Sequence, residues 1–332
     1  MDDWSQTRLF NLFKIFNMKK LKKRQDIVEG LVSFVLPTMN RKDDLIKCIE
    51  SIKSSTYKNI EIIVADNGST DGTFEIINKM FPEVILIRNE LNLGSPVAIN
   101  DCIKKSKGEF IFRLDDDEII EKDTLIKMLK VLKSDLKIGL VSCLYFYTEE
   151  PDKIRSAGLN ISLFTGKTFF YGQDEKNRGQ FNGNIERYGV EGGSHLTRRE
   201  MFEKIGFYDE SFFLSYEDLD WCFRVRRAGY KIVVVSSAKL YHKKLGGLSE
   251  KGNSKRIYLN NRGLVLFMKK NAGWRKLFFF PFFFLMAYPY KTILLLKKRH
   301  FKSIKLLTIG VFEALFYEKV FVYDFNGKKV YY

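Results

Sequence analysis

Short apolar runs alternate with segments of helical periodicity between residues 31 and 146, and this alternation constrains the fold most. The run LVSFVL at 31–36 precedes a stretch, 43–52, whose apolar residues recur every three or four positions. β-Branched runs separated by amphipathic helices indicate βαβ units. The predicted strands are 31–36, 60–65, 84–87, 110–114 and 139–146, and the predicted helices between them are 43–52, 73–80, 96–105 and 124–132. The sequence therefore predicts an α/β fold in which helices flank a mostly parallel sheet.

Polar residues follow four of the predicted strands directly. They are the segments PTMNR at 37–41, DNGSTDG at 66–72, RNELNLGS at 88–95 and DDDE at 115–118. Asn, Asp and Gly are common in turns, so ordinary turn chemistry accounts for any one segment alone. The carboxyl ends of parallel strands meet at one edge, where such sheets bind their ligands. Four polar segments at that edge therefore favour a single binding site.

The acidic run Asp115–Glu118 gives the most specific indication of a ligand among these segments. Four adjacent carboxylates repel one another, and they coexist only with a cation or with raised pKa values. Hard oxygen ligands favour Mg²⁺ or Mn²⁺, especially where a diphosphate completes the coordination shell. Acids at the start of a solvated helix also interact well with the helix dipole. The residues alone leave a metal site and a helix cap as alternatives.

Five motifs in order carry a resemblance to a known family. They are VSFVLPTMNR at 32–41, IEIIVADNGSTDGT at 60–73, RNELNLG at 88–94, DDD at 115–117 and SYEDLDW at 215–221. The set resembles family 2 glycosyltransferases of the GT-A fold, a Rossmann-like architecture, and most of all their rhamnosyltransferase-like and galactofuranosyltransferase-like branches. The likeness spans about residues 31 to 245. It implies an inverting enzyme at the cytoplasmic face of a membrane.

The resemblance implies donor, metal and acceptor positions residue by residue. The nucleotide-sugar donor, with uridine or deoxythymidine diphosphate favoured, is expected at Pro37, Thr38, Asn40, Arg41, Asp66, Asn67, Arg88, Asn92, Gly94, Asp115 and Asp116. Mn²⁺ or Mg²⁺ is expected at Asp115, Asp117 and His242, and the acceptor side at Gly192, Gly193, His195 and Trp221. The implied acceptor is a hydroxyl of a lipid-linked or cell-surface glycan.

The pair Glu217-Asp218 matches the family's catalytic acids, and it implies that Asp218 is the general base. In an inverting single displacement a hydroxyl attacks one face of the anomeric carbon while the diphosphate leaves from the other. A carboxylate must then take the proton of the attacking hydroxyl, while a cation stabilises the leaving phosphate. Acids in the first turn of the predicted helix Glu217–Ala228 also serve as ordinary caps.

Nearly all of the net charge of +16 lies in one segment, Lys243–Lys305, which holds 16 Lys and Arg and the single acid Glu250. The same segment contains Leu277–Leu296, twenty residues with Lys291 as the only charge. That length is enough to span a bilayer. Two prolines and cations at both ends favour an in-plane or re-entrant contact with an anionic membrane surface instead. A true span and a buried helical pair are the alternatives.

The chain therefore divides into three predicted parts: a basic amphipathic extension at 1–29, the catalytic domain at 30–245, and a basic, apolar helical region at 246–332. A competing hypothesis is a non-catalytic membrane or nucleic-acid binding protein that uses the basic segment. The acidic motifs argue against it, so no nucleic-acid partner is expected. A dinucleotide-dependent oxidoreductase would place G-x-G-x-x-G after the first strand, and PTMNRKDD contains no glycine.

Overall fold

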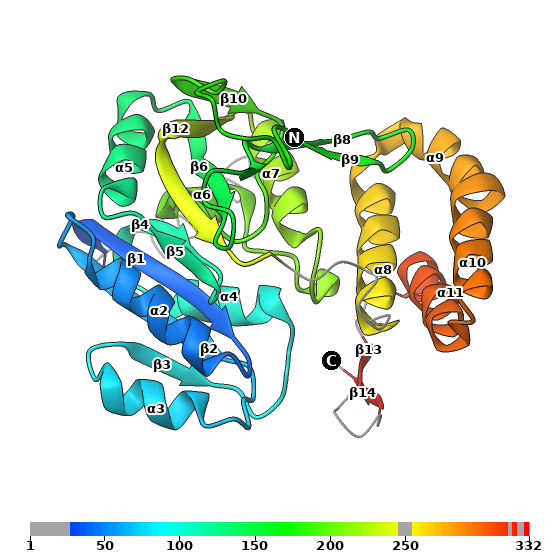
Figure 1. Cartoon of the computed structure of the whole chain (residues 1–332), viewed down its shortest axis with the longest axis horizontal. Coiled ribbons are helices and arrows are strands. Elements are labelled where there is room, and N and C mark those ends of the chain that lie inside the picture. The colour runs from blue at the N-terminus through cyan, green and yellow to red at the C-terminus, as the bar shows by residue number, and fades with distance from the viewer. Residues whose placement is uncertain (1–26, 245–253, 318–320, 324–328, 332) are drawn as a thin grey trace, which may run out of the picture.

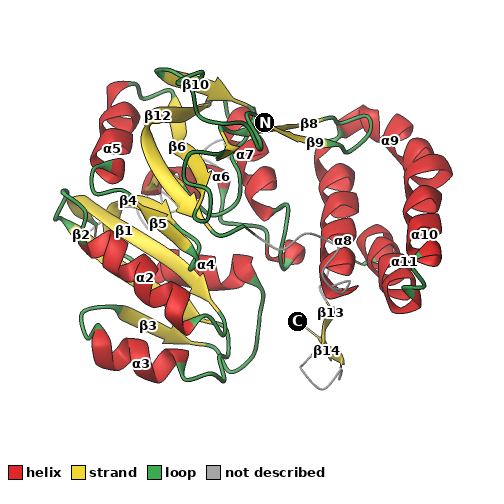
Figure 2. Ribbon diagram, viewed as in Figure 1, coloured by secondary structure: helices red, strands yellow, loops and turns green. Residues whose placement is uncertain are grey.

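The structure is a computed structural model that describes residues 27–244, 254–317, 321–323 and 329–331. The predicted amphipathic extension at 1–29 lies almost wholly outside the described residues. Residues 27–244, here the sheet region, fold around a central sheet, and residues 254–317, here the helical region, stack beside it (Figures 1 and 2).

The central sheet has the strand order β10-β12-β6-β11-β4-β1-β2-β3. These strands are β1 (Val28–Thr38), β2 (Ile60–Asp66), β3 (Ile85–Arg88), β4 (Gly108–Arg113), β6 (Ile138–Tyr147), β10 (Asn184–Arg187), β11 (His195–Arg198) and β12 (Lys231–His242). Strands β1 to β4 run parallel, as do β6 and β12, whereas β11 is antiparallel to its neighbours β4 and β6. The predicted mostly parallel sheet is confirmed.

Helices cover both faces of this sheet (Figure 2). They are α2 (Lys42–Lys53), α3 (Thr73–Met80), α4 (Ser95–Lys105), α5 (Thr124–Ser134), α6 (Arg199–Ile205) and α7 (Glu217–Arg227). Side chains alternate along β1, because successive residues of a strand point to opposite faces. Phe34 and Leu36 join the core beneath α2 and α5, and Val35 joins the core beneath α4 and α7. This alternation builds one apolar core on each face.

Strand register brings the predicted polar ends together at one edge. Thr38 at the end of β1 pairs with Asp66 of β2, and Asp66 pairs with Arg88 of β3. The short strand β5 (Glu118–Ile120) turns back to pair antiparallel with β12, which sets Glu118 opposite His242. The acidic run and the distant histidine therefore meet through backbone pairing. Smaller strands complete the region: β7 (Ile154–Ser156), β8 (Leu159–Ile161) and β9 (Thr168–Phe170), with the 3₁₀ turn η2 (Glu210–Phe212).

The C-terminal part of the chain is helical, as predicted. It contains α8 (Ser254–Asn271), η3 (Gly273–Arg275), α9 (Lys276–Phe282), η4 (Phe283–Ala287), α10 (Tyr288–Lys297) and α11 (Phe301–Phe316), followed by the hairpin β13 (Phe321–Tyr323) and β14 (Lys329–Tyr331). Helix α8 packs on α11 and on α7, so it joins the two regions. One apolar cluster spans the junction, with Phe212 and Leu219 from the sheet region and Phe267 from α8.

The two prolines of the apolar stretch do not end its helix. Helical structure continues from Gly273 to Lys297, and a π-helical turn, Phe283–Ala287, separates α9 from α10. Pro289 has no N–H and its ring crowds the carbonyl four residues earlier, within that turn. A π turn widens the helix at this point, which is a usual way to accommodate such a break.

Candidate active site

An open cavity of about 590 Å³ lies at the carboxyl edge of the sheet. Its walls come from the loops after β1 and β2, the start of α4, the acidic run, the loop before β11, the start of α7, and α8. Of the predicted site residues, Pro37, Thr38, Arg41, Asn67, Asn92, Gly94, Asp115, Asp116, Asp117, Gly192, Gly193, Glu217, Asp218 and His242 line it. A volume of this size suits a small-molecule ligand.

Thr38 and Arg41 hold two of the aspartates on one wall. The Thr38 hydroxyl donates to Asp116 Oδ2 at 2.7 Å, and Arg41 Nη1 donates to Asp117 Oδ2 at 2.5 Å. Burial raises the pKa of Asp116 to about 8, although Arg41 and Thr38 both act in the opposite direction. The loop after β1 therefore fixes the direction in which these carboxylates point.

Asn67, Asn92 and Gly94 form the adjoining wall. The Asn67 amide donates to the Gly94 carbonyl at 3.0 Å, and Asn92 Oδ1 accepts from the Gly94 N–H at 2.9 Å. Gly94 has a φ of +92°, and a Cβ there would lie 2.6 Å from the Phe213 carbonyl oxygen. Only glycine fits this close approach between the α4 loop and the loop that precedes α7.

Asp66 and Asn40 support this wall from behind the cavity surface. Asp66 is buried, and its Oδ1 accepts from the Ser69 N–H at 2.8 Å. Its Oδ2 is buried and has no hydrogen-bond partner within the described residues. Asn40 has a φ of +53° and bridges to the same loop, because its N–H donates to Ser69 and its side chain accepts from Thr70. Both residues shape the loop after β2.

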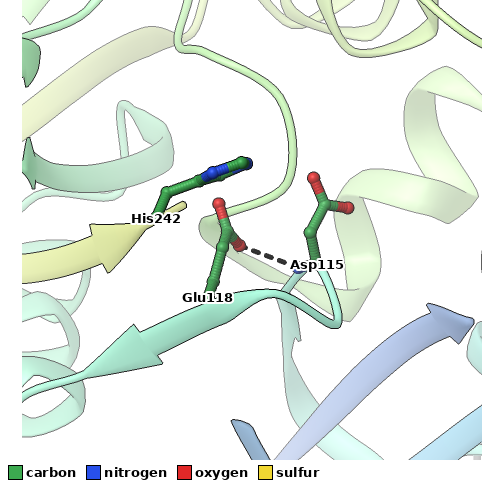
Figure 3. A group of neighbouring side chains, drawn as sticks. All are labelled: Asp115, Glu118 and His242. Carbon is green, nitrogen blue, oxygen red and sulfur yellow. Dashed lines mark hydrogen bonds between the residues drawn. The ribbon is translucent and has the colours of Figure 1, made fainter. Parts of the chain in front are cut away.

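Three side chains converge as a group that can hold a metal ion: Asp115, Glu118 and His242 (Figure 3). Their ligand atoms all lie within 4.8 Å of one another. The predicted trio contained Asp117 in place of Glu118. Asp117 lies next to the group, with Oδ1 at 3.5 Å from His242 Nε2, but its other oxygen is bound by Arg41. The structure thus adds Glu118 to the candidate ligands.

The chemistry of this group fits a divalent cation. Glu118 is fully buried; its Oε2 accepts from the Asp115 N–H and the Ser194 hydroxyl, while its Oε1 has no partner among the described residues. Burial, together with the charges of Asp115 and Asp117, raises the pKa of Glu118 well above its usual range. His242 Nδ1 lies 2.7 Å from the Lys243 carbonyl oxygen. When Nδ1–H donates there, Nε2 keeps its lone pair for a metal.

The two acids of α7 also line the cavity. Glu217 and Asp218 lie in its first turn and are buried. Burial raises the pKa of Asp218 well above its usual range, Glu217 and Asp115 add to this effect, and Arg113 opposes it. A carboxyl group with a raised pKa is a stronger base in its ionised form, which suits proton transfer near neutral pH.

Arg113, at the end of β4, lies between Asp115 and the two acids of α7. Its side chain is 3% exposed, and its guanidinium lies 3.2 Å from Asp115 Oδ1, 3.2 Å from Asp218 Oδ1 and 3.8 Å from Glu217 Oε1. A buried arginine among three carboxylates offsets the repulsion between them. Asp115 and the two carboxylates of α7 are therefore linked through the Arg113 guanidinium.

The loop before α7 is held in an unusual backbone conformation. Phe213, Ser215 and Tyr216 have φ values of +62°, +70° and +73°. Such conformations cost about 1–3 kcal/mol each, and they persist only where surrounding contacts fix them. The Ser95 N–H donates to the Phe213 carbonyl at 2.7 Å, and Gly263 of α8 packs against the Ser215 carbonyl. These contacts aim the first turn of α7 at the cavity.

Three further predicted site residues, Arg88, His195 and Trp221, do not line the cavity, so its lining gives no support to their predicted donor or acceptor contacts. Arg88 does not line the cavity: its side chain pairs with Glu75 at 2.9 Å and covers the Phe74 ring on the surface. His195 and Trp221 are buried and stack with ring centroids 5.5 Å apart, behind the cavity wall. Both rings are part of the core packing, where they fill the space between the sheet and α7.

Gly192 and Gly193, predicted on the acceptor side, line the cavity and lie beside Asp115. A Cβ at Gly193 would lie 2.5 Å from Asp115 Cγ, so this loop can approach only as glycine. The loop continues from Glu191, which binds Arg155 at 2.7 Å. Arg155 in turn lies 3.2 Å from His242 Nδ1.

Several cavity residues were not predicted from the sequence. They are Arg113, Tyr145, Arg155, Glu191, Lys255, Arg256 and Asn260, whereas Glu118 belonged to the predicted acidic run but not to the predicted ligand set. Arg113 gave one usable signal, a charged residue inside the apolar run FIFRL directly before the aspartates. Lys255 and Arg256 belong to the basic segment that was assigned to membrane contact, yet they line the cavity from α8.

A GT-A-type sheet with an acidic cluster at its carboxyl edge defines the glycosyltransferase class, and the comparisons agree. The family profile described as "Glycosyl transferase family 2" matches residues 33–206, which is more than half of the chain. The chain belongs to this family. The solved structure of GalNAc-T7 with UDP, GalNAc and Mn²⁺ superposes with a TM-score of 0.57 at 16% identity, covering 72% of this chain and 47% of that chain, and so shares the fold.

Curated relatives match over limited lengths. The uncharacterized protein y4gI of Sinorhizobium fredii is 30% identical over 64% of this chain and 24% of its own length. The glucosyltransferase WfaP of Escherichia coli, named as acting on α-D-GlcNAc-diphosphoundecaprenol, is 44% identical over 26% of this chain and 36% of its own length. The uncharacterized glycosyltransferase RP339 of Rickettsia prowazekii is 31% identical over 61% of both chains. The chain thus spans about a quarter to a third of the first two relatives.

Proposed function

We propose that the chain is a metal-dependent, inverting glycosyltransferase that moves a sugar from a nucleoside diphosphate sugar to an acceptor hydroxyl. One observation carries the proposal. The cavity is lined both by a metal-capable group, Asp115, Glu118 and His242, and by the buried carboxylate of Asp218, with Arg113 between Asp115 and Asp218. A single displacement needs these two functions on opposite sides of the anomeric carbon.

The donor side would bind the nucleoside diphosphate. Asp115, Glu118 and His242, with Asp117 beside them, would hold Mn²⁺ or Mg²⁺, which neutralises charge on the leaving diphosphate when it is bound. Asp66 Oδ2 is buried behind the cavity wall without a partner among the described residues, so it would accept the imide N–H of uracil or thymine only after a shift of the loop that follows β2. UDP in the GalNAc-T7 structure and UDP-Glc in the name of WfaP also support a uridine or deoxythymidine donor.

The acceptor side would perform the proton transfer. Asp218 takes the proton of the attacking hydroxyl, and Glu217 keeps the surroundings of Asp218 negative. Arg113 remains charged. Burial lowers the pKa of its guanidinium, but the neighbouring Asp115, Asp218 and Glu217 outweigh burial and raise that pKa well above its usual value. Gly192 and Gly193 line the cavity next to Asp115, where the acceptor sugar would lie.

The acceptor is proposed to be a lipid-linked or cell-surface glycan, used at the cytoplasmic face of a membrane. Residues 30–245 would be the catalytic domain and 246–332 the membrane-associating region. The helical stretch Gly273–Lys297 has a mean hydropathy of 1.5 in its most apolar window, of which 11% is buried. Helix α8 lies between that stretch and the cavity, so a headgroup in the cavity is one helix away from a lipid surface. The acceptor in the name of WfaP is also lipid-linked.

A thermal-shift panel tests the donor site. Purified full-length protein is heated with uridine, deoxythymidine, guanosine or cytidine diphosphate, each with and without Mn²⁺. A ligand that binds only the folded state raises the melting temperature. We expect stabilisation by one nucleotide that depends on metal and is lost in Asp115→Ala, but kept in the matched surface variant Asp123→Ala. No stabilisation by any nucleotide, in protein shown to be folded, would contradict the proposal.

A non-catalytic membrane or nucleic-acid binding protein is not favoured by the structure. The buried carboxylates and Arg113 serve no purpose in a surface that only binds anions, because burying charge lowers stability.

A further inference from the structure

The outer side of α9, η4 and α10 is a continuous apolar surface. Exposed side chains recur along it at helical spacing, among them Leu277, Phe278, Leu285, Tyr290 and Ile293, which are 51% to 77% exposed. Large apolar patches of this kind mark interaction sites on a soluble surface. In Figure 1 these helices form the edge of the molecule farthest from β3.

The only charge of this stretch points away from that surface. Lys291 Nζ donates to Asn261 Oδ1 of α8 at 2.7 Å and lies 5.9 Å from the Phe283 ring centroid. The inner side of the helix is otherwise apolar, with Phe279 and Phe283 fully buried. The exposed side from 277 to 296 therefore carries no charge, although the sequence of that stretch contains one.

The sheet region contributes to the same surface through the turn between β8 and β9, which reaches to the start of α9 (Figure 1). Phe164 in this turn packs edge-on against Trp274 at 6.0 Å and against Phe278 at 5.9 Å between ring centroids. Gly166 has a φ of +71°, and a Cβ there would lie 2.8 Å from the Phe279 ring. The turn is thus seated directly on α9.

Cations flank the apolar surface at both ends. Near the turn, Arg275 lies 5.8 Å from the Phe164 ring and 5.2 Å from the Trp274 ring, and Lys167 lies 5.1 Å from the Phe169 ring. At the other end, Lys297 closes α10 and two further exposed cations follow it at 298 and 299. Aromatic rings beside cations suit the interface between lipid headgroups and acyl chains, and the charge suits anionic lipids.

We infer that the β8–β9 turn and the outer side of α9–α10, together called the membrane face, lie on the surface of an anionic bilayer. The sheet region is thereby a direct part of the membrane contact. This inference rests on the proposed membrane association and specifies the surface that makes it. An in-plane contact follows from the packing, since the inner side of the helix is occupied by α8 and by the β8–β9 turn.

Tryptophan fluorescence tests this surface because the chain has three tryptophans. Trp4 is replaced by Phe, and the fully buried Trp221 serves as an internal reference. Trp274 in η3 is 59% exposed at the edge of the membrane face, where it packs against Phe164 and Phe278. The full-length Trp4→Phe protein is mixed with phosphatidylcholine vesicles, with or without phosphatidylglycerol. We expect a blue shift and quenching by brominated lipid with the anionic vesicles, and neither after Trp274→Phe.

A pair of serine variants tests the part played by the turn. Phe164→Ser should weaken partitioning into anionic vesicles about fivefold, since it removes an exposed aromatic ring from the contact. The control Leu136→Ser, at a residue that is 76% exposed beyond α5, should leave partitioning unchanged. Equal partitioning of both variants and the parent would overturn the role of the turn. The metal-dependent thermal shift of each variant verifies that the donor site is intact.

The possible outcomes separate this inference from the wider proposal. Protein that floats with vesicles while Trp274 stays unquenched would refute the membrane face but keep membrane association. Protein that does not float with either kind of vesicle would refute both. Protein that resists extraction from membranes by alkaline carbonate would refute the in-plane contact in favour of a span.

Discussion

The cavity and the membrane face distribute charge in opposite ways. Around the cavity, charged side chains such as Arg113, Glu118 and Asp218 are buried, and the apolar residues lie behind them in the two cores. Along residues 277–296 of the membrane face, apolar side chains are exposed and the single charge, Lys291, is turned inward. Exposing large apolar groups and burying charges both cost free energy in water. The proposed partners match this difference: a charged ligand for the cavity and lipid for the membrane face.

Helix α8 connects the two arrangements. Lys255, Arg256 and Leu259 line the cavity, while the rest of the helix packs against α11 and α9. The loop before α7 rests on Gly263 of the same helix. The comparison thus predicts which changes affect catalysis alone, which affect the membrane face alone, and which affect both.

The largest effect is expected at the general base. Asp218→Asn should lower kcat by about 10²–10⁴-fold, since proton transfer contributes that much. The metal-dependent thermal shift with nucleotide should persist, because Asp218 lies on the acceptor side. The matched control is Asp220→Asn on the same helix: Asp220 binds Arg224 and Asn271 and does not line the cavity, so its replacement should lower stability and leave kcat unchanged. Full transfer activity of Asp218→Asn would refute its role.

The next effect concerns the metal group. Glu118→Gln should weaken Mn²⁺ binding by about 10–100-fold, because Glu118 would be a metal ligand or would orient another ligand. Titration calorimetry with nucleotide present measures the Mn²⁺ affinity. Asp117→Asn provides the comparison, because Asp117 lies beside the group and is held by Arg41. A normal Mn²⁺ affinity in Glu118→Gln with a loss in Asp117→Asn would restore the ligand set predicted from the sequence.

Arg113 should control the pH dependence of the reaction. Asp218 acts as a carboxylate, so kcat/KM should fall as the pH drops through its pKa, which burial raises and Arg113 lowers. Removing the cation in Arg113→Gln should raise that pKa further and move the acidic limb of the pH profile to higher pH. Arg113→Lys keeps the positive charge and should return the acidic limb of the pH profile to lower pH. A limb at the same pH in all three proteins would exclude this electrostatic role.

Two glycines in the helical region should separate catalysis from stability. A Cβ at Gly263 would lie 2.7 Å from the Ser215 carbonyl oxygen, so Gly263→Ala should displace the loop before α7 and lower kcat on the order of tenfold. A Cβ at Gly310 of α11 would lie 2.9 Å from the Tyr258 carbonyl oxygen. Gly310→Ala should lower the free energy of unfolding by about 1–3 kcal/mol without changing kcat. Equal kcat values for the two variants would show that α8 does not position the loop.

The smallest effect is expected on the membrane face. Leu285 is 77% exposed, so Leu285→Ser should change the free energy of unfolding in detergent-free buffer by no more than about 0.5 kcal/mol. Denaturant titration measures this, and vesicle partitioning of the same protein should weaken. A large loss of stability would mean that Leu285 packs inside the molecule rather than against lipid.

The predicted strands and helices of residues 31–146 agree with the structure to within a few residues, because each depends on a local pattern of apolar residues. The polar strand ends also meet as predicted, since parallel strands share one edge. Arg88 lies at that edge as well, but its side chain points to the surface, where it forms an ion pair with Glu75. Position along a strand is encoded locally, whereas the direction of a long side chain depends on its neighbours in space.

The sequence by itself determined the sheet, the acidic run at its edge, the Glu217-Asp218 pair and the apolar stretch at 277–296, because each is a short pattern of adjacent residues. The tertiary structure decided that Glu118 faces His242, that Arg113 bridges Asp115 and Asp218, and that Lys291 turns inward. These relations join residues far apart in the chain. Strand register and helix packing determine them. Burying a side chain or pairing two charges contributes to the free energy of folding only when the elements that carry those residues are packed together.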